Sequence, residues 1–230
     1  MNKTNVIRAA LFLLCMACPC AARQTTPQPK QPEAPAKKAN ARPAAEAAPT
    51  PEPFDGASVE KMGAQCVTLD TEAGAVEVEM LAEAAPETVR HFLNLAAAGA
   101  FDTTTFSRVV RGFVVQGGNL STRETMTAEL AKRARRTVAD EPNAVKHTRG
   151  VLSMARGEEP NSASTHFFIL VGDAPHLDGT FAAFGRVRAG MDVVDKINAA
   201  PLDGEKPEKP VRLTRAVVAQ CAAAPAKSEQ

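Results

Sequence analysis

The 230-residue chain contains no tryptophan and no tyrosine, so its ten phenylalanines are the only large aromatic side chains that can line a core or a pocket. It also lacks an excess of charge of either sign, because 27 basic and 26 acidic residues leave a formal net charge of +1. This balance argues against nucleic acid or an anionic membrane surface as a partner.

Long apolar runs are scarce as well. The run from Ala9 to Ala17 is too short to span a bilayer as a helix, so we expect no stable membrane insertion. Lys3 and Arg8 give this region a positive charge and small residues close it, which is the pattern of a secretory signal peptide over residues 1–22. We therefore expect an exported protein, with a lipid anchor on Cys18 as the less favoured alternative.

Glycine is absent from residues 23–53, a segment that holds eight of the 17 prolines. Such a composition cannot bury enough apolar surface to fold, and it predicts an extended, semi-rigid tether. The expected organisation is a signal peptide over 1–22, a Pro/Ala-rich disordered linker over 23–57, one folded domain over 58–220 and a disordered tail over 221–230.

Alternation of apolar and polar residues predicts eight short strands in the folded domain. They cover residues 66–71, 76–80, 104–110, 113–116, 151–155, 167–171, 182–187 and 211–219. Two helices are expected: one begins at Pro86 and ends before Gly99, and the other covers residues 191–198. Together these elements predict a mainly β fold, an antiparallel barrel with capped ends.

Two polar residues, Arg108 and Gln116, stand among apolar strand residues. A buried arginine on a strand is rare unless it is paired or presented to a ligand. With Phe113, Phe168 and Leu177 as apolar walls, a fixed guanidinium and an amide would make a binding pocket. The residues alone support a second interpretation equally well. In it, Arg108 pairs with an internal carboxylate and the phenylalanines form an ordinary core.

The surrounding stretches carry a family resemblance. Residues 106–118, 150–169 and 176–187, with shorter matches at 85–89, 146–150 and 190–193, resemble the cyclophilin-type peptidyl-prolyl cis-trans isomerases in order and spacing. The resemblance implies a closed eight-stranded antiparallel β-barrel capped by two α-helices. It also implies rotation of X-Pro bonds in Pro-containing polypeptides, without metal or cofactor. A signal peptide before one such domain looks like the periplasmic bacterial members, and a monomer is the default expectation.

The resemblance also implies roles for single residues. By position, Arg108 matches the family's catalytic arginine, and Phe113 and Gln116 match its pocket phenylalanine and glutamine. The further substrate-binding positions are Val114, Met154, Ala155, Arg156, His166, Phe168, His176, Leu177 and Phe181.

Four of these positions depart from the residues that are frequent in the family. They are Val114 in place of Met, His166 in place of Gln, His176 in place of Trp and Phe181 in place of His. Val114 and Phe181 keep the pocket apolar, so we expect activity to survive. His166 is expected to alter substrate preference and rate, and the loss of Trp at position 176 to weaken inhibition by cyclosporin, which that Trp helps to hold in sensitive relatives.

Other functions fit the residues less well. The runner-up is a binding module of the same fold that holds Pro-containing segments with little turnover. A metal site at His166, His176 and Asp178, or a hydrolase pair of Ser164 with His166, lacks the known ligand spacing or a nucleophile elbow. The basic residues of 128–136 fit a short helix or loop with a solvated face better than a nucleic-acid patch.

Only Cys66 and Cys221 lie outside the first 22 residues. The resemblance implies that the first and last strands are antiparallel neighbours, which would bring these cysteines close. Strand alternation, however, places Cys66 on the outer face, and the parity of Leu213 and Val217 places Cys221 on the inner face. We therefore favour two free thiols over a disulfide.

Overall fold

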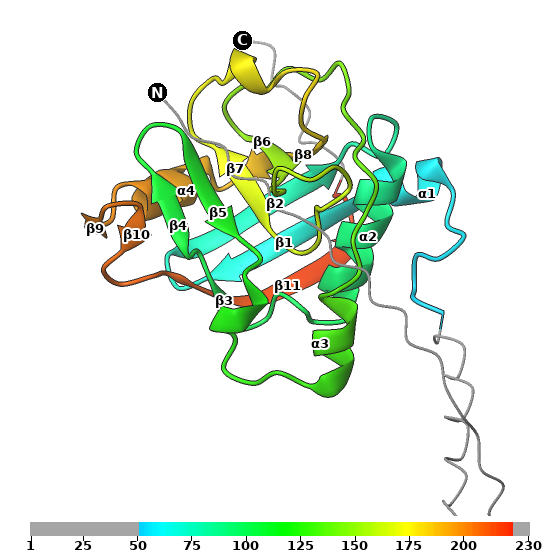
Figure 1. The fold of residues 1–230 in the computed structure, drawn as a ribbon, viewed down its shortest axis with the longest axis horizontal. Helices are drawn as coiled ribbons and strands as arrows, with labels where there is room; N and C mark the ends of the chain where they lie inside the picture. Colours follow the sequence, from blue (N-terminus) through cyan, green and yellow to red (C-terminus); the bar gives the residue numbers. More distant parts are fainter. Residues whose placement is uncertain (1–50, 223–230) are drawn as a thin grey trace, which may run out of the picture. The chain divides into compact units, whose positions relative to one another are not determined.

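The computed structural model describes residues 51–222; the expected signal peptide, most of the expected linker and residues 223–230 of the expected tail lie outside that range. The elements (Figure 1) are α1 (Val59–Gly63), β1 (Gln65–Thr71), β2 (Gly74–Met80), α2 (Pro86–Ala97), β3 (Thr104–Thr105), β4 (Arg108–Val110), β5 (Val114–Gly117), the 3-10 helix η1 (Leu120–Thr122), α3 (Ala128–Arg133), β6 (Val151–Met154), β7 (Phe167–Leu170), the 3-10 helix η2 (Pro175–Leu177), β8 (Ala183–Ala189), α4 (Met191–Asn198), β9 (Leu202–Asp203), β10 (Lys206–Pro207) and β11 (Arg212–Gln220). Within the described range, no helix is long and apolar enough to cross a membrane.

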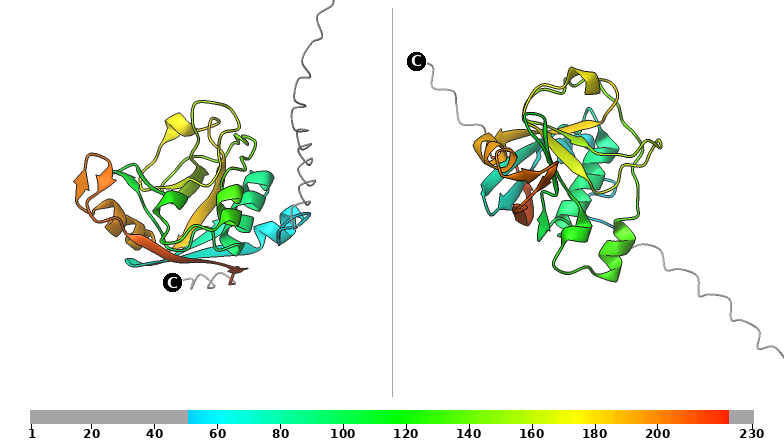
Figure 2. Two further views of the ribbon diagram at one scale, coloured as in Figure 1. Left: turned by 60° about the horizontal axis from the view of Figure 1, so that its bottom comes forward. Right: turned by 60° about the vertical axis from the view of Figure 1, so that its left-hand side comes forward.

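Nine strands form one curled antiparallel sheet in the order β3-β11-β1-β2-β8-β6-β7-β5-β4. The mainly β fold is confirmed, and each of the eight expected strand segments contains strand. The sheet curls into a half-barrel (Figure 2) rather than the closed eight-stranded barrel that we expected. The expected strand over 104–110 is in fact two, β3 and β4, which form the two edges of the sheet.

The break between β3 and β4 has a local cause. Phe106 is buried in the core, and its N–H donates to the carbonyl of Val211 near β11. The next N–H, of Ser107, donates to Gln116 on β5 instead. The chain therefore changes partner strand within two residues, which regular pairing on one strand cannot accommodate.

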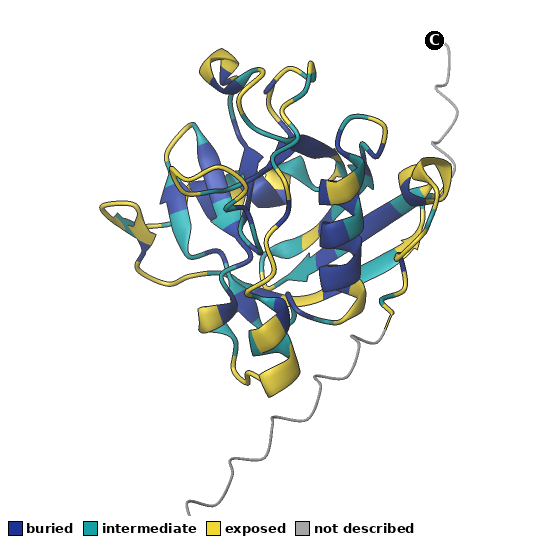
Figure 3. Cartoon of the chain, turned by 45° about the vertical axis from the view of Figure 1, so that its right-hand side comes forward, coloured by how far each residue is buried: buried dark blue, intermediate teal, exposed yellow. Residues whose placement is uncertain are grey.

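Phenylalanine fills the inside of the half-barrel, as the absence of Trp and Tyr requires. Phe92 lies with its ring centroid 4.9–5.3 Å from those of Phe101, Phe167 and Phe184. All four side chains are almost fully shielded from solvent. Figure 3 shows this buried interior, with exposed residues concentrated in loops and on the short outer helices.

The two expected capping helices, α2 and α4, lie at opposite ends of the half-barrel (Figures 1 and 2). Proline at the first helical position begins α2, but Ala85 offers no side-chain cap. The carboxylate of Glu141 caps it instead, accepting hydrogen bonds from the N–H groups of Glu87 and Thr88 at 3.1 and 2.7 Å. The helices α1 and α3 are additional; α3 matches the short basic helix that was one of the readings of residues 128–136.

Residues 51–57, which we expected in the disordered linker, pack on α2. Phe54 is 8% exposed and belongs to the core, and its N–H donates to Asn94 Oδ1 at 2.8 Å. Arg90 donates to the carbonyls of Phe54 and Ala57 at 2.6 and 2.9 Å. The linker boundary at residue 57 is therefore wrong: an apolar anchor and satisfied backbone groups make these residues part of the fold.

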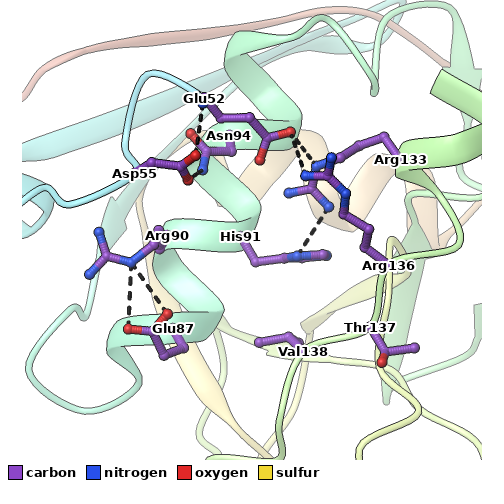
Figure 4. Close-up of a pocket in the computed structure, with 10 residues that line it drawn as sticks. All are labelled: Glu52, Asp55, Glu87, Arg90, His91, Asn94, Arg133, Arg136, Thr137 and Val138. Carbon is purple, nitrogen blue, oxygen red and sulfur yellow. Dashed lines mark hydrogen bonds and ion pairs between the residues drawn. The ribbon is translucent and has the colours of Figure 1, made fainter. Parts of the chain in front are cut away.

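A polar cluster joins this segment to α3 and α2 (Figure 4). Glu52 accepts from Arg133 Nε at 2.6 Å, and Arg133 is buried rather than on the solvated face that we expected. A nitrogen of the same guanidinium lies 3.3 Å from His91 Nδ1, and His91 Nε2 lies 2.6 Å from the carbonyl of Ser164. Because a carbonyl only accepts, Nε2 carries the proton and Nδ1 accepts from Arg133.

Cys66 and Cys221 form a disulfide with their Cα atoms 4.8 Å apart, so the expectation of two free thiols is wrong. The cause is a bulge in β11. The pairing with β1 passes from Leu213 directly to Arg215, which leaves Thr214 without a partner on β1. A bulge of one residue reverses the alternation of the strand beyond it.

The burial pattern of β11 agrees with this reversal. Leu213 and Ala216 are both buried although they are three residues apart, which an uninterrupted strand would not allow. Cys66 pairs with Ala219, so Cys221, two residues further on, faces the same side of the sheet as Cys66. The disulfide therefore lies on the outer face.

Candidate active site

Strand register brings the predicted polar residues together. Arg108 on β4 pairs with Gln116 on β5, which pairs in turn with Phe168 on β7. Residues that are directly opposite share a face, so these three side chains form a row across the outer side of the sheet. Their neighbours Val115 and Ile169 point the other way, into the core.

A second apolar cluster covers this outer face. It consists of Val114, Val151, Phe168, Leu170, Ala174, Leu177 and Ala183, with Phe113, Ala155 and Phe181 packed against it. Part of it comes from the loop that contains η2. The cluster thus forms between the sheet and this loop, apart from the main core inside the half-barrel.

A buried histidine holds the loop in place. His147 Nδ1 and the backbone N–H of His147 both lie within hydrogen-bond distance of Asp178 Oδ1, at 3.2 and 2.8 Å. On its other side, His147 Nε2 lies 3.3 Å from Ser153 Oγ on β6, and Ser153 donates to the carbonyl of Ala182. Desolvation by burial lowers the pKa of His147. This network anchors both ends of the segment that carries Leu177 and Phe181.

Between the sheet and the loop lies a pocket of about 200 Å³. Its lining is Arg108, Phe113, Val114, Gln116, Ala155, Arg156, Phe168, Leu177 and Phe181. All nine belong to the twelve residues that we singled out from the sequence. The volume is below the roughly 300–1,000 Å³ of drug-sized sites, and it suits a single small ring.

The guanidinium of Arg108 stands at the polar side of this pocket. Its Nη1 donates to Gln116 Oε1 at 3.3 Å, and its Nε donates to Glu205 Oε2 at 2.7 Å. The sequence left open whether Arg108 faces a ligand or pairs with an internal carboxylate. Arg108 does have a carboxylate partner, Glu205, but the side chain of Glu205 is 57% exposed and therefore not internal. Arg108 is therefore both paired and presented to the pocket. We did not predict Glu205, and no sequence signal pointed to it.

A second arginine lines the pocket. Arg156 lies over the ring of Phe181, with its guanidinium carbon 5.0 Å from the ring centroid. Its nearest carboxylate is Asp140, at 3.9 Å. The Nε of Arg156 is buried and has no hydrogen-bond partner within residues 51–222. The lining of the pocket thus combines two arginines, Arg108 and Arg156, with apolar side chains.

The other three predicted residues do not line the pocket. Met154 is 3% exposed and belongs to the main core. His166 is half-buried, burial lowers its pKa, and its carbonyl accepts from Ala155 N–H at 3.0 Å. His176 is exposed, with its ring centroid 5.5 Å from that of Phe113. His166 and His176 thus lie next to the lining residues Ala155 and Phe113.

The glycines after Gln116 allow a close approach of neighbouring groups. A Cβ on Gly117 would lie 3.1 Å from the ring of Phe106. Gly118 has a φ of 79°, and a Cβ there would collide with the carbonyl oxygen of Thr165. Side chains at these positions would push β5 away from β7 and open the row that contains Arg108.

The metal and hydrolase alternatives find no support. His176 packs on Phe113 and Asp178 binds His147, and the described residues contain no group of three His, Cys, Asp or Glu side chains that could hold a metal ion. Ser164 Oγ lies within hydrogen-bond distance of two backbone carbonyls, those of Ala134 and Arg136, and is not paired with His166.

Comparison with known proteins now decides the family. A family model described as cyclophilin type peptidyl-prolyl cis-trans isomerase/CLD matches residues 66–218. The peptidyl-prolyl cis-trans isomerase cypE of Dictyostelium discoideum is 36% identical over 157 residues, which cover 67% of this chain and 98% of that protein. The chain is a cyclophilin-type peptidyl-prolyl cis-trans isomerase.

Further relatives of this cyclophilin come from plants and bacteria. Isomerase CYP23 of Arabidopsis thaliana is 37% identical over 143 residues, which cover 61% of this chain and 63% of that protein's length. Isomerase B of Escherichia coli is 37% identical over 139 residues, or 57% and 82% of the two chains. A Cryptosporidium parvum cyclophilin crystallised in the presence of the dipeptide Ala-Pro matches the cyclophilin fold with a TM-score of 0.60 at 27% identity, over 67% of this chain and 98% of that one.

Proposed function

We propose that the 200 Å³ pocket binds the proline ring of an X-Pro segment and that Arg108 is the catalytic residue of this isomerase. The observation that carries the proposal is the position of one guanidinium, held by Gln116 and Glu205, at the edge of a pocket with Phe113 among its apolar walls. The Ala-Pro dipeptide named with the Cryptosporidium relative is consistent with a ligand of this size.

The chemistry requires a donor rather than a nucleophile. Amide resonance imposes a barrier of roughly 18–20 kcal/mol on rotation about the peptide bond. In the twisted state the proline nitrogen regains a lone pair, so a hydrogen bond to it is stronger there than in the planar ground state. Arg108 would donate this bond, and a charge-assisted hydrogen bond is worth roughly 1.5–3 kcal/mol. The apolar walls would exclude the water that otherwise competes for the amide.

Replacing Arg108 tests the assignment. Arg108→Ala should lower kcat/KM by about 10²–10³-fold, or about 3–4 kcal/mol, in a protease-coupled assay on a Pro-containing peptide. Arg108→Lys should also lose most activity, because an ammonium lacks the planar fork of donors. Arg186→Ala, an exposed arginine on β8 outside the pocket, is the matched control. An Arg108→Ala protein with near wild-type rate would refute the catalytic role.

The same assay separates turnover from holding. A chaperone-like module that binds Pro-containing segments with little turnover would leave the rate at the uncatalysed background. The donor at the pocket edge favours turnover, because binding a proline ring needs only the apolar walls.

We further propose that the protein acts on folding or exported polypeptides outside the cytoplasm, in the periplasm of a bacterium, as a monomer. The disulfide supports an oxidising compartment, since such bonds are rare in the cytosol. Relatives in Escherichia coli and Acinetobacter baylyi show that bacteria carry such isomerases. Cell fractionation of the full chain, with mass analysis of its N-terminus, tests export, cleavage after Ala22 and lipidation at Cys18 together; a cytoplasmic, uncleaved protein would contradict the proposal.

A further inference from the structure

Arg108 is fixed from outside the pocket by an element that the sheet does not include. The short hairpin of β9 and β10 lies beside β4 (Figure 1), and Glu205 occupies its turn. The carboxylate of Glu205 accepts from Arg108 Nε at 2.7 Å, shorter than the 3.3 Å bond from Arg108 Nη1 to Gln116. Glu205 is therefore the closest polar partner of this guanidinium within residues 51–222.

The backbone sets the place of Glu205. The N–H of Val109, the residue after Arg108, donates to the carbonyl of Glu205 at 2.8 Å. The N–H of Glu208 donates to the carbonyl of Pro201 at 3.0 Å and closes the hairpin at its base. Gly204 has a φ of 61°, a left-handed conformation that turns the chain at this point. Backbone hydrogen bonds thus fix the turn that places the Glu205 carboxylate beside Arg108.

The two bonds together restrict which N–H groups of Arg108 can act. Nε is taken by Glu205 and Nη1 by Gln116, and no side chain or carbonyl among the described residues bonds Nη2. Since a guanidinium is planar, fixing Nε and Nη1 also fixes the directions of the three remaining N–H donors, one on Nη1 and two on Nη2. A long side chain held in this way loses less rotamer freedom when substrate binds.

We propose that Glu205 is a positioning residue that aims the free N–H donors of Arg108 at the substrate in the pocket. The inference rests on the proposed catalytic role of Arg108. Arg108 and Glu205 side chains are 43% and 57% exposed, and pairs this exposed contribute little to folding. The effect of Glu205 should therefore appear in catalysis and hardly in stability.

Glu205 also has an electrostatic effect on Arg108 that opposes the effect of positioning on the rate. A carboxylate at 2.7 Å also weakens the positive potential of the guanidinium. If this electrostatic effect dominated, removing the carboxylate would raise the rate. If positioning dominates, removing it lowers the rate, because the donor is no longer aligned with the proline nitrogen.

Steady-state kinetics on the full chain distinguish the two effects. Glu205→Ala should lower kcat/KM by about five- to tenfold, equivalent to about 1–1.4 kcal/mol, mainly through kcat. Glu205→Gln retains an acceptor and should lose only about twofold to threefold. Glu208→Ala removes the same charge from the same hairpin and is exposed, with no side-chain contact to Arg108, so it should behave as wild type. Urea midpoints should be unchanged in all three.

A double-mutant cycle links the effect to Arg108. In an Arg108→Lys background, measured at high enzyme concentration, Glu205→Ala should cost less than twofold, because the aligned donor is already lost. A wild-type or faster Glu205→Ala enzyme, an equal loss in Glu208→Ala, or full additivity with Arg108→Lys would each overturn the inference. An active Arg108→Ala enzyme would instead refute the catalytic role itself, so the two failures are distinguishable.

Discussion

Acidification should destabilise the fold through one buried side chain, His91. Burial first, and the Arg133 guanidinium second, lower the pKa of His91 from 6.5 to about 4. The unfolded chain therefore binds a proton on this histidine at a pH where the folded chain does not. The free energy of unfolding is then complete above about pH 6.5, falls as the pH drops toward about 4 and levels off below that.

The size of the effect follows from the same pKa values. A shift of this size, at 1.36 kcal/mol per pKa unit, corresponds to about 3 kcal/mol when the loss is complete, and about 2 kcal/mol is already lost at about pH 5. The geometry explains the sign (Figure 4). Protonation would place a hydrogen on Nδ1, which now accepts from Arg133 at 3.3 Å, so an accepted hydrogen bond would become a contact between two cations.

Urea unfolding at about pH 7.5 and pH 5 measures this loss. Far-UV circular dichroism must follow it, because the chain has no tryptophan or tyrosine for fluorescence. Burial also lowers the pKa of His147 and His166, so the effect of His91 is the difference between wild type and His91→Gln, an amide that does not titrate. His176→Gln, at an exposed histidine, is the matched control for the substitution itself. An equal loss in wild type and His91→Gln would refute the reasoning.

Two further predictions concern the disulfide and inhibition. Reducing the bond between Cys66 and Cys221, which are 155 residues apart, should lower the free energy of unfolding by about 5 kcal/mol in the chain-entropy model. Urea unfolding with and without reductant measures this; a protein with both residues changed to Ser should not respond to reductant, and a wild type that does not respond either would contradict the prediction. Cyclosporin should inhibit weakly, and His176→Trp should be inhibited more tightly, because an indole beside Phe113 offers more apolar area and a donor. Equal inhibition of the two proteins in the isomerase assay would rule this explanation out.

Local sequence patterns predicted the main elements where the local period and the tertiary structure agree. Val67 and Leu69 alternate inward on β1 because one face of that strand is buried against the core. Pro86 and Gly99 marked the ends of α2 through their fixed or permissive backbone angles. The hairpin of β9 and β10 was missed because strands of two residues are too short to show any alternation.

The lining of the pocket was predictable from the sequence, but the carboxylate that holds Arg108 was not. The family resemblance identified nine residues that line it. Strand register brings three of them, Arg108, Gln116 and Phe168, into one row. Glu205 was not predictable in this way. It lies 97 residues from Arg108 along the chain, in a turn whose sequence shows only an ordinary exposed glutamate. A contact between a strand and a turn from distant parts of the chain leaves no periodic signal in either of them.

The disulfide shows why alternation alone cannot assign the face of a residue at the end of a long strand. The face assigned to a residue by counting from Leu213 is correct only if every residue in between alternates regularly. One extra residue, Thr214, reverses the face assigned to Cys221. The bulge lies where Thr214 Oγ1 donates to the carbonyl of Asp70 and its own carbonyl accepts from Thr103, so neighbouring chain segments hold the irregular residue. Such bonds come from tertiary structure and are invisible to a count along β11. The face on which Cys221 meets Cys66 at one end of β11 thus depends on a bulge at the other end.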